Sequence, residues 1–95
     1  MNNIIYDIKS YELVSNDEYD FFVVDEHYCY EINVNKIFEL VENEINTVFN
    51  KFDDVSDVTI WKFAVHKVLR KEYAEIKGTN RKMLIRLLLD EFGII

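Results

Sequence analysis

The apolar residues of this chain change their spacing once, at residues 33–35, and this change most restricts the possible folds. Before it, in HYCYEINV at residues 27–34, apolar and polar residues alternate, so that Tyr30 and Ile32 fall on the same side. Alternation is typical of a strand with one solvent-facing side. After it, in residues 36–52, apolar residues recur three or four positions apart, which is the period of an amphipathic helix. The sequence therefore predicts strands first and helices afterwards.

Asn, Asp and Ser must set most of the chain breaks, because proline is absent and glycine occurs twice. Strands are expected at 4–14, 19–24 and 27–34, with turns at 15–18 and near 25–26. Helices are expected at 36–52, 58–77 and 80–92, capped by Asn35, by Ser56 or Asp57, and by Thr79 or Asn80, with Gly78 ending the second. The predicted fold is one α+β domain over residues 1–95, a three-stranded antiparallel meander followed by three helices packed on one face (βββααα).

The same periodicity predicts which side chains form the core. Each strand and each helix should contribute the apolar residues that recur on one of its faces. The expected core residues are Ile4, Tyr6, Phe21, Val23, Tyr30, Ile32, Phe38, Val41, Ile45, Trp61, Val65, Val68, Leu84, Leu87, Leu88 and Phe92.

Charge is distributed unevenly along the chain, whose formal net charge is -7. Residues 1–58 hold 14 Asp and Glu against 3 Lys, whereas residues 59–95 hold 4 Asp and Glu against 8 Lys and Arg. An asymmetry of this kind indicates an electrostatic partner but does not say which half meets it.

Motifs that carry catalytic or metal chemistry are scarce. Asp25, His27, Cys29 and Glu31 would project from one face of a strand, and zinc accepts such side chains. Neighbours two positions apart on one strand diverge, however, and the second histidine, His66, falls on a distant helix. The sequence also contains no glycine-rich phosphate loop and no nucleophile motif. We therefore expect no enzyme, no catalytic residue, no cofactor and no essential metal.

The segment EYAEIKGTNRKMLIRLL at residues 72–88 has the spacing of two helices around a turn. A small residue stands four positions before Gly78, and apolar residues stand six and nine positions after it; these are Ala74, Leu84 and Leu87. The segment resembles the helix-turn-helix motif of DNA-binding proteins. The resemblance implies that the base-facing positions are Asn80, Arg81, Lys82, Ile85 and Arg86. A plain helical hairpin with a glycine cap has the same pattern.

The helix expected at 58–77 carries Lys62, His66 and Arg70 four positions apart. Such a ridge suits phosphates or an acidic protein, although most charged ridges are solvated surface. One alternative is therefore a helix-turn-helix-like transcriptional regulator that binds duplex DNA through residues 70–87. Its expected nucleic-acid-binding residues are Lys62, His66, Arg70, Asn80, Arg81, Lys82 and Arg86.

The acidic half of the chain favours a different hypothesis, a non-enzymatic protein-binding module. Carboxylates at both ends of the meander and on the first helix could imitate a phosphate backbone and block a protein's nucleic-acid groove. The expected partner-binding residues are Asp17, Glu18, Asp20, Asp25, Glu26, Glu39, Glu42, Asp53 and Asp54. Tyr11, Tyr19 or Phe22 would supply an apolar anchor.

The expected partner is a host protein with a basic, nucleic-acid-binding surface. Heavy use of residues with AT-rich codons favours a low-GC bacterium or a phage or mobile element within one, so the hypothesis is a phage-type host inhibitor such as an anti-CRISPR protein. No apolar stretch approaches the ~18 residues of a membrane span. We therefore expect a cytoplasmic protein with no membrane partner.

Overall fold

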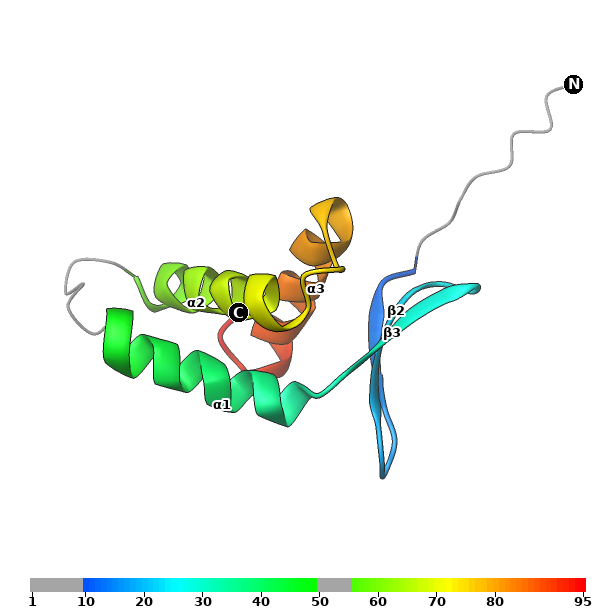
Figure 1. Cartoon of the computed structure of the whole chain (residues 1–95), viewed down its shortest axis with the longest axis horizontal. Helices are drawn as coiled ribbons and strands as arrows, with labels where there is room; N and C mark the ends of the chain where they lie inside the picture. Colours follow the sequence, from blue (N-terminus) through cyan, green and yellow to red (C-terminus); the bar gives the residue numbers. More distant parts are fainter. Residues whose placement is uncertain (1–9, 50–55) are drawn as a thin grey trace, which may run out of the picture.

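The elements of the chain follow in the order βββααα in the computed structural model, which describes residues 10–49 and 56–95 (Figure 1). Strands β1 (Glu12–Ser15), β2 (Asp20–Asp25) and β3 (Tyr28–Ile32) form an antiparallel sheet with β2 in the middle. Helices α1 (Val34–Glu44), α2 (Asp57–Glu72) and α3 (Gly78–Glu91) follow, and α1 continues into a π-helix, η1 (Ile45–Phe49). The predicted α+β class and order of elements are confirmed.

Asn and Asp side chains close both turns of the sheet in place of glycine. Oδ1 of Asn16 accepts hydrogen bonds from the backbone N–H groups of Glu18 and Tyr19, each at 2.8 Å. Oδ1 of Asp25 accepts one from the backbone N–H of His27, also at 2.8 Å. These side chains take the place of a backbone turn bond, which is why the chain turns twice without glycine.

Strand β2 buries the face opposite to the predicted one. Phe22 and Val24 are 0% and 2% exposed, whereas Phe21 and Val23 lie half-buried on the outer side of the sheet. The prediction that Phe21 and Val23 belong to the core is therefore wrong. The cause is the sequence FFVV, which is apolar at four successive positions and gives no alternation from which to choose a face.

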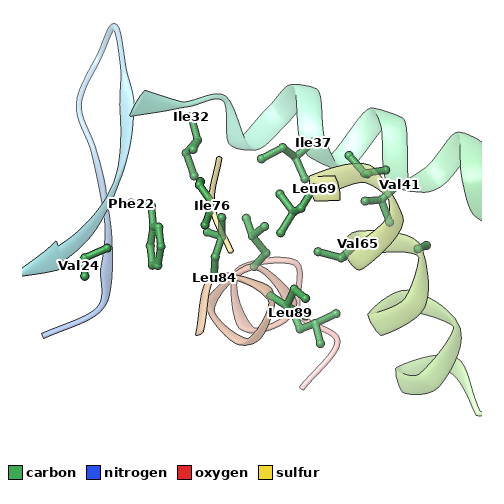
Figure 2. Close-up of a cluster of buried hydrophobic side chains, with 14 residues drawn as sticks. Phe22, Val24, Ile32, Ile37, Val41, Val65, Leu69, Ile76, Leu84 and Leu89 are labelled. Carbon is green, nitrogen blue, oxygen red and sulfur yellow. The ribbon is translucent and has the colours of Figure 1, made fainter. Parts of the chain in front are cut away.

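The inner face of the sheet packs against the helices through a single apolar cluster (Figure 2). Figure 2 shows Ile76 and Leu84 between Phe22 of the sheet and Ile37 and Leu69 of the helices. Ile76 belongs to the connection between α2 and α3, so this connection, together with the start of α3, links the two layers. The buried residues are Phe22, Val24, Ile32, Ile37, Val41, Ala64, Val65, Val68, Leu69, Ile76, Leu84, Ile85, Leu88 and Leu89.

The expected core is confirmed in part. Ile32, Val41, Val65, Val68, Leu84 and Leu88 are buried. Tyr30, Ile45, Trp61, Leu87 and Phe92 are half-buried and pack around the core. Phe38 is half-buried, and Ile4 and Tyr6 lie outside the described residues. The rings of Phe38, Trp61 and Phe92 form a cluster of their own, with centroids 4.9 to 6.2 Å apart.

Helix α2 ends at Glu72, five residues before the predicted end. Ile76 is fully buried between sheet and helices, and the chain leaves the helix at Tyr73 to place it there. Gly78 has the predicted left-handed conformation, with φ of 59°. It starts α3, however, and does not end α2, so the predicted helix boundaries of 77 and 80 are wrong.

The N-cap of helix α1 lies two residues before the predicted one. Asn33, not Asn35, is the N-cap, and its Oδ1 accepts from the backbone N–H of Lys36 at 2.9 Å. Oδ2 of Asp20 accepts from the backbone N–H of Val34 at 2.8 Å, which ties the start of α1 to β2. Ser56 caps α2, as predicted. Of the strand expected at 4–14, residues 4–9 lie outside the described residues.

Candidate functional site

The β1–β2 turn presents the first predicted acidic cluster. Because Asn16 closes this turn, Asp17 and Glu18 stand at its tip, and both are exposed. Together with Asp20 they line a polar hollow of about 510 Å³. Strand β3 adds Glu31 to this hollow, the start of α1 adds Asn33, and the end of α2 adds Tyr73. The structure therefore brings Asp17, Glu18 and Asp20 together, as expected. Glu31 belongs to the same hollow but was not among the residues expected to bind a partner.

Two of the predicted partner-binding acids also have local structural roles. Asp20 accepts the hydrogen bond that starts α1, and Asp25 accepts the bond that closes the β2–β3 turn. Both residues are half-buried. Replacing either one would disturb the fold as well as the surface charge, so Asp17 and Glu18 are the better positions for testing a partner.

The remaining predicted acids are spread over the molecule. Glu26 stands at the opposite end of β2 from Asp17 and lies 3.2 Å from the Nε2 atom of His27, with both side chains 85% exposed. Glu39 and Glu42 are exposed on α1. Asp53 and Asp54 lie outside the described residues. The placement of carboxylates at both ends of the meander agrees with the expected topology.

The outer sheet face carries apolar residues beside these acids. It is formed by Glu12, Val14, Phe21, Val23, Cys29 and Glu31. Register assigns this face, since Phe21 pairs with Val14 and Glu31, and Val23 pairs with Glu12 and Cys29. Val14 is 41% exposed, and Tyr19 at the adjoining turn is 51% exposed with its ring 6.3 Å from that of Phe21. The result is an apolar strip flanked by carboxylates.

The three apolar anchors proposed from the sequence differ in exposure. Phe22 is fully buried, so the expectation that it contacts a partner is wrong. Tyr11 is half-buried with its ring stacked 6.1 Å from that of Phe22, and its contact with a partner stays a prediction. Tyr19 is exposed, and Val14 and Phe21 extend the strip that it begins.

The predicted nucleic-acid-binding residues separate into two groups. Lys62 and His66 of α2 and Lys82 and Arg86 of α3 line one groove, with a volume of about 720 Å³. The six other residues that line it are all apolar: Val58, Phe63, Met83, Ile85, Leu89 and Ile95. Phe63 is 59% exposed, and sequence reasoning missed it. A signal existed, since Phe63 falls between the expected core positions Trp61 and Val65 on the other side of the helix.

Asn80 and Arg81 are tied into the fold. Oδ1 of Asn80 accepts a hydrogen bond from the hydroxyl of Tyr11 at 3.2 Å, and Nε of Arg81 donates one to the backbone carbonyl of Ile76 at 2.8 Å. Both residues are half-buried, and Arg70 is exposed. Helix α2 has ended before Ala74, which is exposed in the connection to α3 and not part of a helix. Ala74 is therefore not a small residue on a helical face that lets two helices approach, which is the role that the helix-turn-helix resemblance gives it.

His66 is the groove residue whose protonation is most affected by its surroundings. Burial first, and then the positive charges of Arg81 and Arg70, lower the pKa of His66 below its ordinary value. The imidazole is consequently neutral at neutral pH, and the fixed positive charges of the groove are Lys62, Lys82 and Arg86.

Two ion pairs occur in the described part of the chain, His27–Glu26 and Lys67–Glu44. Nζ of Lys67 lies 2.9 Å from Oε2 of Glu44 and joins α2 to α1. This oxygen is buried and accepts no hydrogen bond from the described residues, so the charge of the Lys67 ammonium group is what offsets its burial. Neither pair uses Lys62, Lys82 or Arg86.

Residues 10–49 and 56–95 contain no group of three or more His, Cys, Asp or Glu side chains that could hold a metal ion. Cys29 is a free cysteine and is exposed on the outer sheet face. None of the described helices is long and apolar enough to cross a membrane. Comparisons with protein-family models, curated proteins and solved structures find no match for this chain.

Proposed function

We propose that the chain is a non-enzymatic protein-binding module that docks on a basic, nucleic-acid-binding protein through the outer sheet face and the adjoining β1–β2 turn. By covering a surface that otherwise holds phosphates, it would inhibit that protein. Inhibitors of this kind, among them anti-CRISPR proteins, are encoded by phages and mobile elements, and the AT-rich codon usage implied by the composition fits such a source.

The observation that carries this proposal is the apolar strip of Val14, Tyr19 and Phe21 beside exposed carboxylates. A stable interface needs an apolar anchor that is removed from water, and the charges around it determine the choice of partner. The strip supplies the anchor. Asp17, Glu18 and the flanking acids of the outer sheet face supply a negative field that favours a basic surface.

The spacing of the carboxylates suits a surface that holds several phosphates. Asp17 and Glu26 stand at opposite ends of β2, whose six residues span about 20 Å at ~3.3 Å per residue. Phosphates recur about every 3.4 Å along one strand of DNA. Exposed acids on α1, Glu39 and Glu42, widen the negative surface beyond the sheet.

Affinity capture from a lysate of a low-GC bacterium, followed by a binding assay with the purified captured protein, tests the proposal. The decisive variant is Asp17→Lys/Glu18→Lys, because both side chains are exposed at the turn tip and neither accepts a hydrogen bond from the backbone of residues 10–49 and 56–95. The matched control is Asp90→Lys/Glu91→Lys, which changes the net charge equally on exposed residues of α3.

Wild type and the α3 control should capture a nucleic-acid-binding protein that heparin or duplex DNA displaces. The turn variant should not capture this protein. For wild type, the association rate should fall as the salt concentration rises, because ions screen the attraction between opposite charges. A partner that binds the turn variant as tightly as wild type contradicts the proposal. So does a partner that carries no basic surface.

A helix-turn-helix-like DNA-binding regulator is the second candidate function. The gathering of Lys62, His66, Lys82 and Arg86 from two helices around one groove favours it. The apolar lining of that groove and the structural use of Asn80 and Arg81 weigh against it. A titration with duplex DNA, described in the Discussion, separates the two candidates.

A further inference from the structure

The groove between α2 and α3 is lined by apolar side chains that are exposed to solvent and are not needed for the core. Phe63 is 59% exposed, Val58 is 42% exposed and Ile95 is 55% exposed, and all three line the same groove. Ile85 and Leu89 beneath them are almost fully buried and connect the groove to the core. Exposed apolar residues scattered singly are ordinary, but a contiguous group with polar neighbours marks an interaction site.

We propose that this groove is a docking site for an acidic amphipathic helix of a partner protein. The site lies on a different part of the molecule from the outer sheet face and shares no residue with it or with the polar hollow. It is therefore a second interaction surface, and it stands whether or not the sheet binds a basic partner.

The dimensions of the groove suit a helix. Val58 and His66 mark its extent along α2, and eight residues of helix correspond to about 12 Å, or roughly two turns. Lys82 and Leu89 mark a similar length along α3. A helix that lies in a groove of two turns inserts apolar residues at positions such as i, i+4 and i+7. A volume of about 720 Å³ has room for several such side chains.

The charges around the groove indicate that the occupant is acidic. Each helix contributes two basic residues four positions apart, Lys62 and His66 from α2 and Lys82 and Arg86 from α3. Lys62, Lys82 and Arg86 are exposed, and neither ion pair of the described residues involves them. Carboxylates that flank the apolar stripe of a bound helix would meet these cations. The rest of the chain is strongly acidic, so a local positive surface also selects the orientation of an acidic partner.

A second copy of the chain is a poorer occupant. A two-fold symmetric dimer through this groove would place Lys62, Lys82 and Arg86 of both copies against one another, which is repulsive. Duplex DNA is also poorer, because its phosphates and sugars offer little to an apolar surface formed by Phe63, Met83 and Ile95.

The test uses the full chain and three synthetic helical peptides of about 16 residues, a length at which an isolated helix can form. All three carry leucines at i, i+4, i+7 and i+11, and their flanking positions hold only Glu, only Gln or only Lys. Calorimetry or fluorescence anisotropy measures the affinity of each peptide. The Glu peptide should bind at least about tenfold more tightly than the Gln peptide, and the Lys peptide should not bind.

Two variants of the chain locate the binding. Phe63→Ala removes an exposed side chain and should weaken the Glu peptide at least about tenfold without loss of folded protein. Lys82→Glu/Arg86→Glu should abolish its preference over the Gln peptide. The matched control is Lys71→Glu/Lys77→Glu, which reverses two exposed charges outside the groove and should leave binding unchanged. Asp17→Lys/Glu18→Lys should also leave it unchanged, which separates this site from the outer sheet face.

Several outcomes overturn the proposal. One is a Glu peptide that binds no better than the Lys peptide, and another is binding that survives both Phe63→Ala and Lys82→Glu/Arg86→Glu. Tighter binding of a single-stranded or duplex oligonucleotide that these variants abolish would assign the groove to nucleic acid. Self-association that Phe63→Ala removes, measured by light scattering, would assign it to a second copy.

Discussion

The hydroxyl of Tyr11 and the Oδ1 atom of Asn80, 69 positions apart in the sequence, are joined by a hydrogen bond of 3.2 Å. The bond connects the start of the sheet to the first turn of α3, close to the rings of Phe22 and Tyr30. Burial, and then the neighbouring Tyr28, raise the pKa of Tyr30, so this region is partly shielded from water. Asn80 therefore acts as a tie between the two layers of the fold.

Asn80→Ala should lower the free energy of unfolding by about 0.5–1.5 kcal/mol, because it leaves the Tyr11 hydroxyl without its partner. Urea denaturation followed by circular dichroism measures the change. Thr79→Ala, at the exposed neighbouring position, should stay within about 0.5 kcal/mol of wild type. Equal free energies of unfolding for the two variants would show that the hydrogen bond between Tyr11 and Asn80 contributes nothing to stability.

A second prediction concerns the buried face of β2. Phe22→Ala should destabilise the chain by about 3–5 kcal/mol, since it leaves a cavity between the sheet, Ile76 and Leu84. Phe21→Ala, on the outer sheet face, should cost no more than about 1 kcal/mol. Denaturation of both variants measures the difference. If Phe22→Ala does not fold, Val24→Ala against Val23→Ala makes the same comparison, and a larger loss for the outer residue would contradict the assigned face.

Gly78 makes a third prediction, which concerns backbone conformation. Its φ of 59° is unfavourable for residues with a Cβ atom, although a Cβ at this position would have no heavy atom within 4 Å. Gly78→Ala should therefore lower stability by about 1 kcal/mol through backbone strain alone. Gly78→Asn should lower it less, because Asn tolerates the left-handed region. Thermal unfolding of both variants checks the order, and an equal loss for Asn and Ala would indicate a different cause.

His66 makes the fourth prediction, on pH. Its pKa in the folded chain is lowered by burial and by Arg81 and Arg70, and Lys62, Lys82 and Arg86 share its groove. Well above the ordinary pKa of about 6.5, the imidazole is neutral in both the folded and the unfolded chain and has no effect on stability. As the pH falls through this value, the unfolded chain binds the proton more readily, so stability declines until the pH lies below the folded pKa.

His66→Gln should therefore lose less stability than wild type between about pH 7 and pH 5. Chemical denaturation at several pH values in this range gives the difference, and comparison between variants cancels the contribution of the carboxylates that both share. A His66→Gln chain that follows the wild-type pH dependence would exclude the proposed cause.

The order of elements could be predicted because one signal, the change of apolar period near residues 33–35, decides it locally. The turns were predicted for the right reason, since Asn16 and Asp25 close them without glycine. The buried face of β2 could not be predicted, because Phe21 to Val24 are all apolar and the choice is made by packing against Ile76 and Leu84. The end of α2 likewise depends on where Ile76 is buried, a tertiary requirement that local propensity does not contain.

The residues of the candidate sites were likewise predicted only in part from the sequence. Lys62 and His66 were recognised from their spacing, and Lys82 and Arg86 from the resemblance to the helix-turn-helix motif. Lys62 and Lys82 belong to different helices, so their approach depends on how α2 packs on α3. The apolar lining was missed because Phe63 reads in the sequence as one more apolar residue of a helix that has a core face. Its exposure becomes visible when the core positions of α2, among them Ala64, Val65 and Val68, are known.

The last prediction concerns duplex DNA, which separates the two candidate functions. We expect no sequence-specific binding at physiological salt, and no affinity beyond the non-specific range of about 10⁻⁴–10⁻⁶ M. Residues 1–58 carry 14 carboxyl side chains, and a negative charge of this size repels the phosphates that Lys82 and Arg86 would attract. Asn80 and Arg81, which the helix-turn-helix resemblance makes base-facing, are already hydrogen-bonded within the fold.

Fluorescence anisotropy with random and AT-rich duplexes, at two salt concentrations of about 0.05 and 0.15 M, measures both the affinity and its salt dependence. Lys82→Ala/Arg86→Ala tests whether any binding uses the groove, and Lys71→Ala/Lys77→Ala is the control with the same change in charge on exposed residues outside it. Sub-micromolar, sequence-dependent binding that the first variant abolishes and the second retains would establish the DNA-binding candidate. The acidic sheet would then serve another purpose, and the proposal of a phosphate-mimicking inhibitor would be wrong.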